Sequence, residues 1–200
     1  FFFFFPHDTN SPETSHMSAK KKPSASWSDV KAKIAHFDQS AMLALIHDLY
    51  AANKDNQVFL HARFSLGDDA LKPYKATIRR WLCPDVFKNQ DFSVSKAKKA
   101  VSDYKKAVGV PAGVAELAVY SCECAAEFFV EFGAQDEGSA DALVRLFTNA
   151  LALVVKLDLD VAQPMLARLM EVSEDSQQFG YGVGEEMGQL LSAHRHKLDA

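Results

Sequence analysis

Apolar residues recur three or four positions apart along almost the whole chain, the spacing that places them on one face of an α-helix. The segment AMLALIHDLYAAN (41–53) shows this pattern, with Met42, Leu45 and Leu49 on one stripe. No segment alternates between apolar and polar positions as a half-buried strand does. The pattern therefore predicts an all-α fold.

Capping residues, prolines and glycines divide this pattern into about nine helices. Asp and Ser suit N-caps, Pro suits a first turn, and Gly suits a left-handed position after a last turn. The predicted helical segments are 27–37, 41–53, 54–67, 68–84, 91–109, 111–133, 136–157, 160–173 and 185–197. Short links favour antiparallel hairpins, either in a single bundle or in a short irregular α-α array.

The N-terminal residues differ from the rest. Residues 1–16 (FFFFFPHDTNSPETSH) precede Met17 and are interpreted as a vector-derived tag, and residues 17–26 are expected to form a disordered basic tail. Residues 27–200 have the length of a single helical domain. Hydrophobic residues make up 48% of the chain and charged residues 24%, which is typical of a globular protein with a full core.

Three features indicate where the protein works. No apolar run approaches the roughly 18 residues that span a bilayer, so we expect no membrane association. The chain has three cysteines without a disulfide-framework spacing, which favours a reducing compartment. With no export signal, the expected location is the cytoplasm.

The stretch YSCECAAEFFVEFG (120–133) concentrates cysteines, glutamates and phenylalanines. On a helix at 100° per residue, Cys122 and Cys124 point about 200° apart, so they cannot share a metal ion or form a disulfide. We predict that both thiols are buried as small apolar groups. No zinc-ligand spacing is present in the native segment, and neither a metal nor a cofactor is expected.

The glutamates of the same helix form a separate stripe within about 80° of one another, at Glu116, Glu123, Glu127 and Glu131. One interpretation is a solvated face. A second is pairing with the basic helix that precedes it in the chain, through Lys98, Lys99, Lys105 and Lys106. A third is a carboxylate metal cluster, although the Glu-x-x-His spacing of such sites occurs only at Glu13–His16, inside the tag.

Charge is distributed unevenly along the chain. Residues 72–106 contain ten Lys and Arg against three acids, a formal +7, whereas residues 107–200 carry a formal −10. Lys72, Lys75 and Arg79 follow the i, i+3, i+7 spacing of one helical face. This face is either solvated, paired internally, or a phosphate-binding surface for nucleic acid, although no sequence-reading DNA- or RNA-binding motif accompanies it.

Signals for catalysis are weak. FGYGVG (179–184) has glycines before a helix, but a dinucleotide loop follows a strand, so a tight turn is the preferred interpretation. No histidine has a local Cys or Ser partner. An enzymatic role, as an unrecognised hydrolase or metal-dependent enzyme, is therefore the least favoured alternative, and no catalytic residue is assigned.

Five segments together resemble an uncharacterised bacterial family, a domain of unknown function. They are LYAANKDNQVFLHARF (49–64), YKATIRRWLCP (74–84), AKKAVSDYKKAVG (97–109), EFFVEFGAQDEG (127–138) and FGYG (179–182). The resemblance implies a cytoplasmic, helical, single-domain protein and supplies no functional residues. Tyr181 departs from the family pattern, which often has Trp in this segment.

The leading functional hypothesis is a non-enzymatic helical module that binds another protein or a second copy of itself. Nucleic-acid association through residues 72–106 is the alternative. The candidate interaction surface combines the basic stripe, the acidic stripe and exposed aromatic residues: Arg63, Lys72, Lys75, Arg79, Lys99, Tyr104, Glu123, Glu127, Glu131 and Tyr181.

Overall fold

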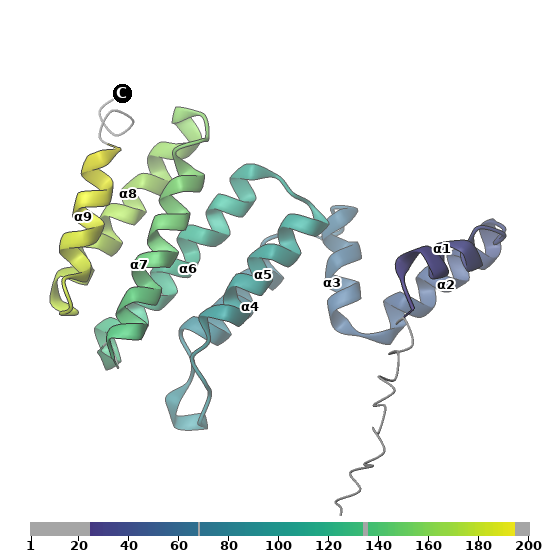
Figure 1. Ribbon diagram of the computed structural model, residues 1–200, viewed down its shortest axis with the longest axis horizontal. Coiled ribbons are helices and arrows are strands. Elements are labelled where there is room, and N and C mark those ends of the chain that lie inside the picture. Colours follow the sequence, from purple (N-terminus) through teal and green to yellow (C-terminus); the bar gives the residue numbers. More distant parts are fainter. Residues whose placement is uncertain (1–24, 68, 134–135, 195–200) are drawn as a thin grey trace, which may run out of the picture. The chain divides into compact units, whose positions relative to one another are not determined.

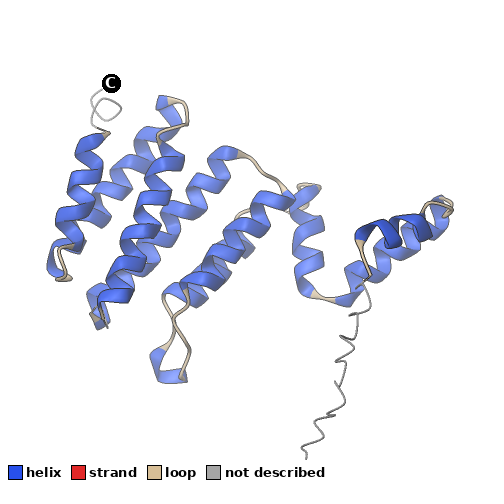
Figure 2. Cartoon of the chain, viewed as in Figure 1, coloured by secondary structure: helices blue, strands red, loops and turns tan. Residues whose placement is uncertain are grey.

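The computed structural model describes residues 25–67, 69–133 and 136–194. Within these ranges the chain forms nine α-helices and two short 3₁₀-helices and contains no strand (Figure 2). The predicted all-α fold is confirmed. The predicted tag and residues 17–24 of the predicted tail lie outside the described residues.

The nine helices coincide with the nine predicted segments, with ends that differ by a few residues. They are α1 (Trp27–Ile34), α2 (Gln39–Ala52), α3 (Lys54–Arg63), α4 (Lys72–Leu82), α5 (Val94–Ala107), α6 (Pro111–Phe132), α7 (Glu137–Val154), α8 (Leu159–Asp175) and α9 (Val183–Ala193). The sequence pattern did not predict the 3₁₀-helices η1 (Val86–Lys88) and η2 (Ser176–Gln178).

The chain divides into two compact units, Phe1–Ile46 and His47–Ala200. The described part of the first unit holds α1 and the start of α2. Ser26 and Asp29 form a capping box at the start of α1, and the Asp38 carboxylate accepts a 2.7 Å hydrogen bond from the Ala41 amide at the start of α2. Neither helix contains a buried residue. The helix predicted over residues 27–37 therefore forms over Trp27–Ile34.

The second unit contains three antiparallel hairpins, α4/α5, α6/α7 and α8/α9, arranged in two layers (Figure 1). Helices α4, α6 and α8 pack side by side in one layer. In the other layer α7 packs against α9, and α3 packs against α5. Helices α5 and α7, by contrast, are not among the pairs that pack closely, so α6 is partly uncovered between them.

Helix α6 lies at the centre of the second unit, in contact with α4, α5, α7 and α8. Its thiols are buried as predicted, with Cys122 0% and Cys124 1% exposed. Near its start, Gly113 lies against the Tyr104 ring of α5, where a β-carbon would stand 2.1 Å from the hydroxyl oxygen. Near its end, Phe128 and Phe129 stack with Phe92 at ring-centroid distances of 5.3 and 5.7 Å.

Candidate functional site

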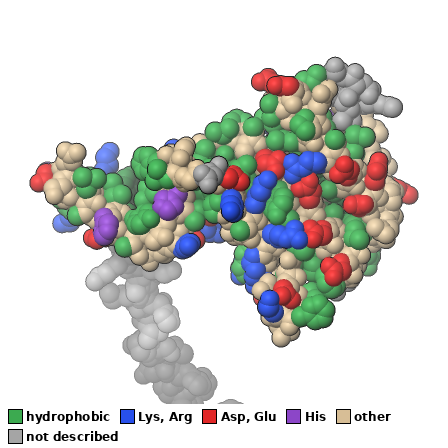
Figure 3. Space-filling model, turned by 180° about the vertical axis from the view of Figure 1, so that it is seen from behind, with side chains coloured by type: hydrophobic (Ala, Val, Ile, Leu, Met, Phe, Trp, Pro, Cys, Tyr) green, Lys and Arg blue, Asp and Glu red, His purple; other side chains and the backbone are tan. Residues whose placement is uncertain are grey.

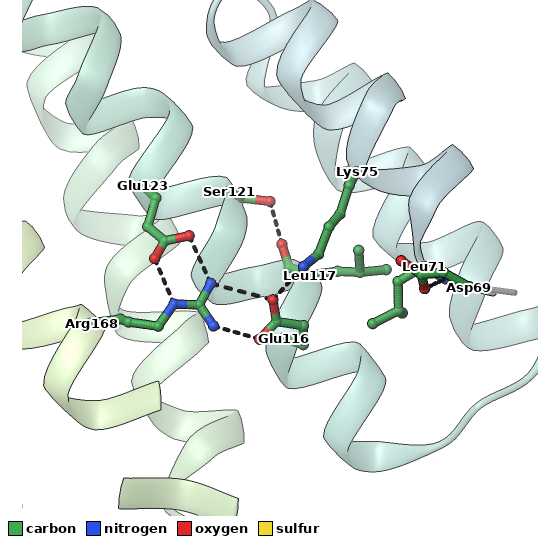
Figure 4. Close-up of polar contacts among 8 residues, drawn as sticks. All are labelled: Asp69, Leu71, Lys75, Glu116, Leu117, Ser121, Glu123 and Arg168. Carbon is green, nitrogen blue, oxygen red and sulfur yellow. Dashed lines mark hydrogen bonds and ion pairs between the residues drawn. The ribbon is translucent and has the colours of Figure 1, made fainter. Parts of the chain in front are cut away.

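The glutamate stripe of α6 is occupied by basic side chains from two neighbouring helices (Figure 4). Arg168 of α8 donates to Glu123 at 2.6 and 2.7 Å and to the Glu116 Oε2 atom at 2.6 Å. Lys75 of α4 donates to the other Glu116 oxygen at 2.6 Å. These contacts fasten α4, α6 and α8 together, and Figure 3 shows basic and acidic side chains intermingled on this face.

A second pair joins α4 to α6 further along. Arg79 donates from both terminal nitrogens to the Glu127 carboxylate, at 2.9 and 2.7 Å, the two-pronged geometry that favours Arg–carboxylate pairs. Both side chains are about half exposed, at 49% and 51%, so solvent weakens the attraction.

The structure thus shows internal pairing for Glu116, Glu123 and Glu127, whereas Glu131 is exposed, as a solvated face requires. The predicted partners need a correction. The partners come from α4 and α8, not from the four lysines of α5. The reason is geometric: Lys98 and Lys105 lie beside Val114, Ala118 and Ser121 of α6, on a different side of that helix from the glutamates. Lys99 instead pairs with Asp103 on its own helix at 2.5 Å. Among the described residues, no group of His, Cys, Asp or Glu is arranged to hold a metal ion.

The pairs change the protonation of the groups involved. Burial raises the pKa of Glu116, but hydrogen bonds from Arg168 and Lys75 outweigh burial and hold it below its ordinary value. Glu127 has a lowered pKa, chiefly because Arg79 donates to it. Both carboxylates are therefore charged at neutral pH and act as structural anions.

The remaining candidate surface residues are dispersed. Tyr104 is only 4% exposed and packs edge-on against Tyr74 at 5.4 Å, so it is corrected from a surface residue to a core residue. The helical periodicity of α5 did not distinguish the buried Tyr104 from the exposed lysines beside it in the sequence. The exposed members are Arg63 at the end of α3, Lys72 at the start of α4, Glu131 at the end of α6 and Tyr181 before α9.

A groove that sequence reasoning missed lies between α5 and α7, with α6 as its floor. Its volume is about 340 Å³. Each helix contributes a stripe at helical spacing: Lys98, Val101, Ser102 and Lys105 from α5; Val114, Ala118 and Ser121 from α6; and Leu146, Asn149 and Leu153 from α7. The stripes on α5, α6 and α7 each span seven residues, so the groove follows the helix axes for about 10 Å.

Small side chains keep this groove open. Ala118 and Ser121 occupy the positions of α6 that line the groove, whereas larger side chains, Phe128 and Phe129, stack with Phe92 nearer the end of α6. The Ser121 hydroxyl donates to the Leu117 carbonyl oxygen at 2.7 Å, so its proton is already used. The floor therefore behaves as an apolar surface. It lies about 150° around α6 from the centre of the glutamate stripe.

The rim of the groove is cationic. Lys98 and Lys105 are exposed, and no acidic residue lines the groove. Within the described part of the chain neither lysine belongs to any of the ion pairs. Two uncompensated positive charges over an apolar floor stand out in a chain whose formal net charge is −4.

A larger cavity of about 530 Å³ lies among α3, α4 and α5. Its cations are already engaged: Lys99 and Lys106 share Asp103, at 2.5 and 3.7 Å, and Lys96 stands 3.7 Å from the centre of the Trp81 ring. Asp55 adds a second negative charge to its lining. The cavity offers a ligand little unsatisfied charge, which makes the α5–α7 groove the stronger candidate.

Comparisons with protein-family models, curated proteins and solved structures give no match. The resemblance to an uncharacterised bacterial family therefore stays a prediction. In the described residues, no helix combines the length and the apolar character needed to cross a membrane.

Proposed function

We propose that this protein is a helical interaction module that binds an acidic, amphipathic segment of a partner protein in the α5–α7 groove. The observation that carries the proposal is the pairing of an apolar floor with two rim lysines, Lys98 and Lys105, that have no acidic neighbour in the groove lining.

The dimensions of the groove favour a short helical segment. Grooves of this kind receive the apolar face of an amphipathic helix through side chains at i, i+3 or i+4, and i+7. Such anchors span about 10 Å, the length of the stripe from Val114 to Ser121. Carboxylates beside the anchors would meet Lys98 and Lys105, and Asn149 can hydrogen-bond to the segment from the α7 wall.

The nucleic-acid alternative has less support. Lys75 and Arg79, two of the three residues in the predicted phosphate-binding stripe, are held by Glu116 and Glu127. Proteins that bind single strands use aromatic side chains as stacking platforms, and no aromatic residue lines the groove. A protein segment fits the groove chemistry better.

A peptide-display selection tests the proposal. A library of random 14-residue peptides is selected on the full chain, and enriched peptides are measured by fluorescence anisotropy. We expect sequences with Leu, Ile or Phe at helical spacing flanked by Asp or Glu. The double variant Lys98→Glu/Lys105→Glu should bind them at least about tenfold more weakly, since two attractions become repulsions.

Two matched variants separate the groove from general charge effects. Lys31→Glu/Lys33→Glu makes the same change in net charge on exposed residues of α1 and should leave the affinity nearly unchanged. Ala118→Leu fills the floor without changing charge and should also weaken binding. The proposal is wrong if no peptide is enriched, if the Lys98/Lys105 variant binds as tightly as the original chain, or if single-stranded nucleic acid binds the groove in place of peptides.

A further inference from the structure

Helices α5 and α7, the two walls of the groove, run in the same direction. Helix α5 ends at Ala107 and α6 begins at Pro111, and α6 ends at Phe132 and α7 begins at Glu137. Links this short reverse the chain, so α5 and α7 are each antiparallel to α6. Figure 1 shows both walls in the same layer. The groove is therefore bounded by two parallel helices, and its two ends differ.

The two ends of the groove differ in the helix termini that lie beside them. One end is lined by Lys98, Ser121 and Leu146, and the other by Lys105, Val114 and Leu153. Lys105 and Leu153 belong to the last turns of α5 and α7, and Val114 belongs to the first turn of α6. Two last turns carry partial negative charge there, against the partial positive charge of one first turn. The Lys98 end lies away from the termini of α6 and α7, so its positive charge is less offset.

The cationic groups of the groove lie on one wall only. Lys98 and Lys105 are both on α5, seven residues or about 10 Å apart, whereas the α7 wall is neutral. Within the described residues, the side chains of both lysines are free of hydrogen bonds and ion pairs. A bound helix meets both lysines when it carries acids that are also two turns apart, on the flank that faces α5.

On the premise of the proposed function, that the groove holds a helical segment of a partner, we propose that this segment runs antiparallel to both α5 and α7 and carries acids at i and i+7 on the flank facing α5. In this direction the partly positive first turn of the segment meets the last turns of α5 and α7, and its first acid pairs with Lys105. The partly negative last turn extends toward Lys98, which pairs with the second acid. The opposite direction brings three negative last turns together at the Lys105 end. Since interactions with helix termini are modest, the preferred direction should bind about fivefold more tightly.

Paramagnetic labelling of a bound peptide tests the direction on the full chain. The probe is a 14-residue peptide enriched in the display selection, made with a nitroxide at either its N-terminus or its C-terminus. The N-terminal label should broaden the methyl signals of Leu153 at least about fivefold more than those of Leu146, because the two side chains lie about 10 Å apart along one wall. The C-terminal label should do the reverse. The opposite pattern, or equal broadening of both residues by both labels, would overturn the inferred direction.

Charge exchange tests the pairing of each lysine with its acid. Lys105→Glu should weaken peptide binding about fivefold, and changing the first acid of the peptide to Lys should restore the affinity, whereas changing the second acid should not. Lys98→Glu should be rescued only through the second acid. The matched control is a peptide of the same composition whose acids face α7, and it should bind about fivefold more weakly. Circular dichroism of each variant checks that the fold is unchanged.

The outcomes separate this inference from the proposed function. If no peptide is enriched, or if the enriched peptides bind away from the groove, both are wrong. If peptides perturb the groove signals but show the opposite label pattern, exchange charge with the other lysine, or lack acids seven residues apart, this inference alone is wrong and the groove remains a peptide site.

Discussion

Arg168 forms more hydrogen bonds to the glutamates of α6 than any other basic residue described in the structure. Its guanidinium forms ion pairs with both Glu116 and Glu123 of α6, and Lys75 forms a second ion pair with Glu116. The positive charge of Arg168 therefore offsets the repulsion between the two carboxylates. The side chains of Arg168 and Glu116 are 29% and 16% exposed, which screens this cluster less than the other pairs of the second unit.

Replacing Arg168 with Gln should lower the free energy of unfolding by about 2 kcal/mol, because hydrogen bonds to charged groups are lost and two carboxylates are left close together. Arg145→Gln is the matched control, since Arg145 forms an exposed i,i+4 pair with Asp141 at 3.6 Å. It should change stability by less than about 0.5 kcal/mol. Urea unfolding measures both, and equal losses would contradict the assigned role.

Gly113 is required by the close approach of α5 and α6. A β-carbon there would collide with the buried Tyr104 ring, so Gly113→Ala should destabilise the fold by about 1–3 kcal/mol through overpacking. Gly188 of α9 is a control, because nothing lies within 4 Å of its added β-carbon. Gly188→Ala should stabilise by about 0.5–1 kcal/mol through helix propensity. Thermal unfolding distinguishes the opposite signs.

At the scale of elements, helix positions were predictable because periodicity and caps are local. The burial of Cys122 and Cys124 was also predictable from the wheel of α6. The basic partners of the glutamate stripe were not predictable from the sequence. Arg168 lies 45 residues after Glu123, and the choice between α4, α5 and α8 depends on how the hairpins stack. The sequence pattern did not predict the groove for the same reason, because its three lining stripes on α5, α6 and α7 come together only in the folded unit.

The orientation of α6 predicts the reactivity of its thiols. Burial raises the pKa of Cys124 to about 11 and raises that of Cys122 further, so neither is a thiolate at pH 8. Cys83 is half-buried, and burial raises its pKa as well. A thiol-reactive disulfide reagent should modify at most one cysteine in the native protein within minutes and all three after denaturation. Rapid labelling of Cys122 in the native state would refute this packing.

At the scale of the second unit, the two layers are held differently. Ion pairs on one side of α6 fasten α4, α6 and α8, while on the other side α5 and α7 diverge over small residues. The fastened layer fixes the spacing of the hairpins, and the divergent layer supplies the groove. The charge pattern of the sequence indicated that the glutamates of α6 pair with basic residues, but it gave no sign of the groove between α5 and α7.

The fastened layer makes stability depend on acid pH. A glutamate whose pKa is lower in the folded protein than in the unfolded chain stabilises the fold above its unfolded pKa, and this stabilisation is lost as pH falls through the folded pKa. Glu116 and Glu127 are of this type. Unfolding free energy should therefore fall below about pH 4.5, the ordinary glutamate value. Glu116→Gln should have a shallower pH dependence, and an unchanged slope would contradict the pairing.

The central claim is that the divergence of α5 and α7 creates a ligand site. The most direct test is a nuclear magnetic resonance titration of the full chain with a peptide from the display selection, following backbone amides and methyl groups. The account predicts saturable shift changes concentrated on the groove stripes, including Val101, Ala118 and Leu153. Shift changes centred instead on the Trp81 cavity or on α1 and α2, with the groove unperturbed, would contradict it.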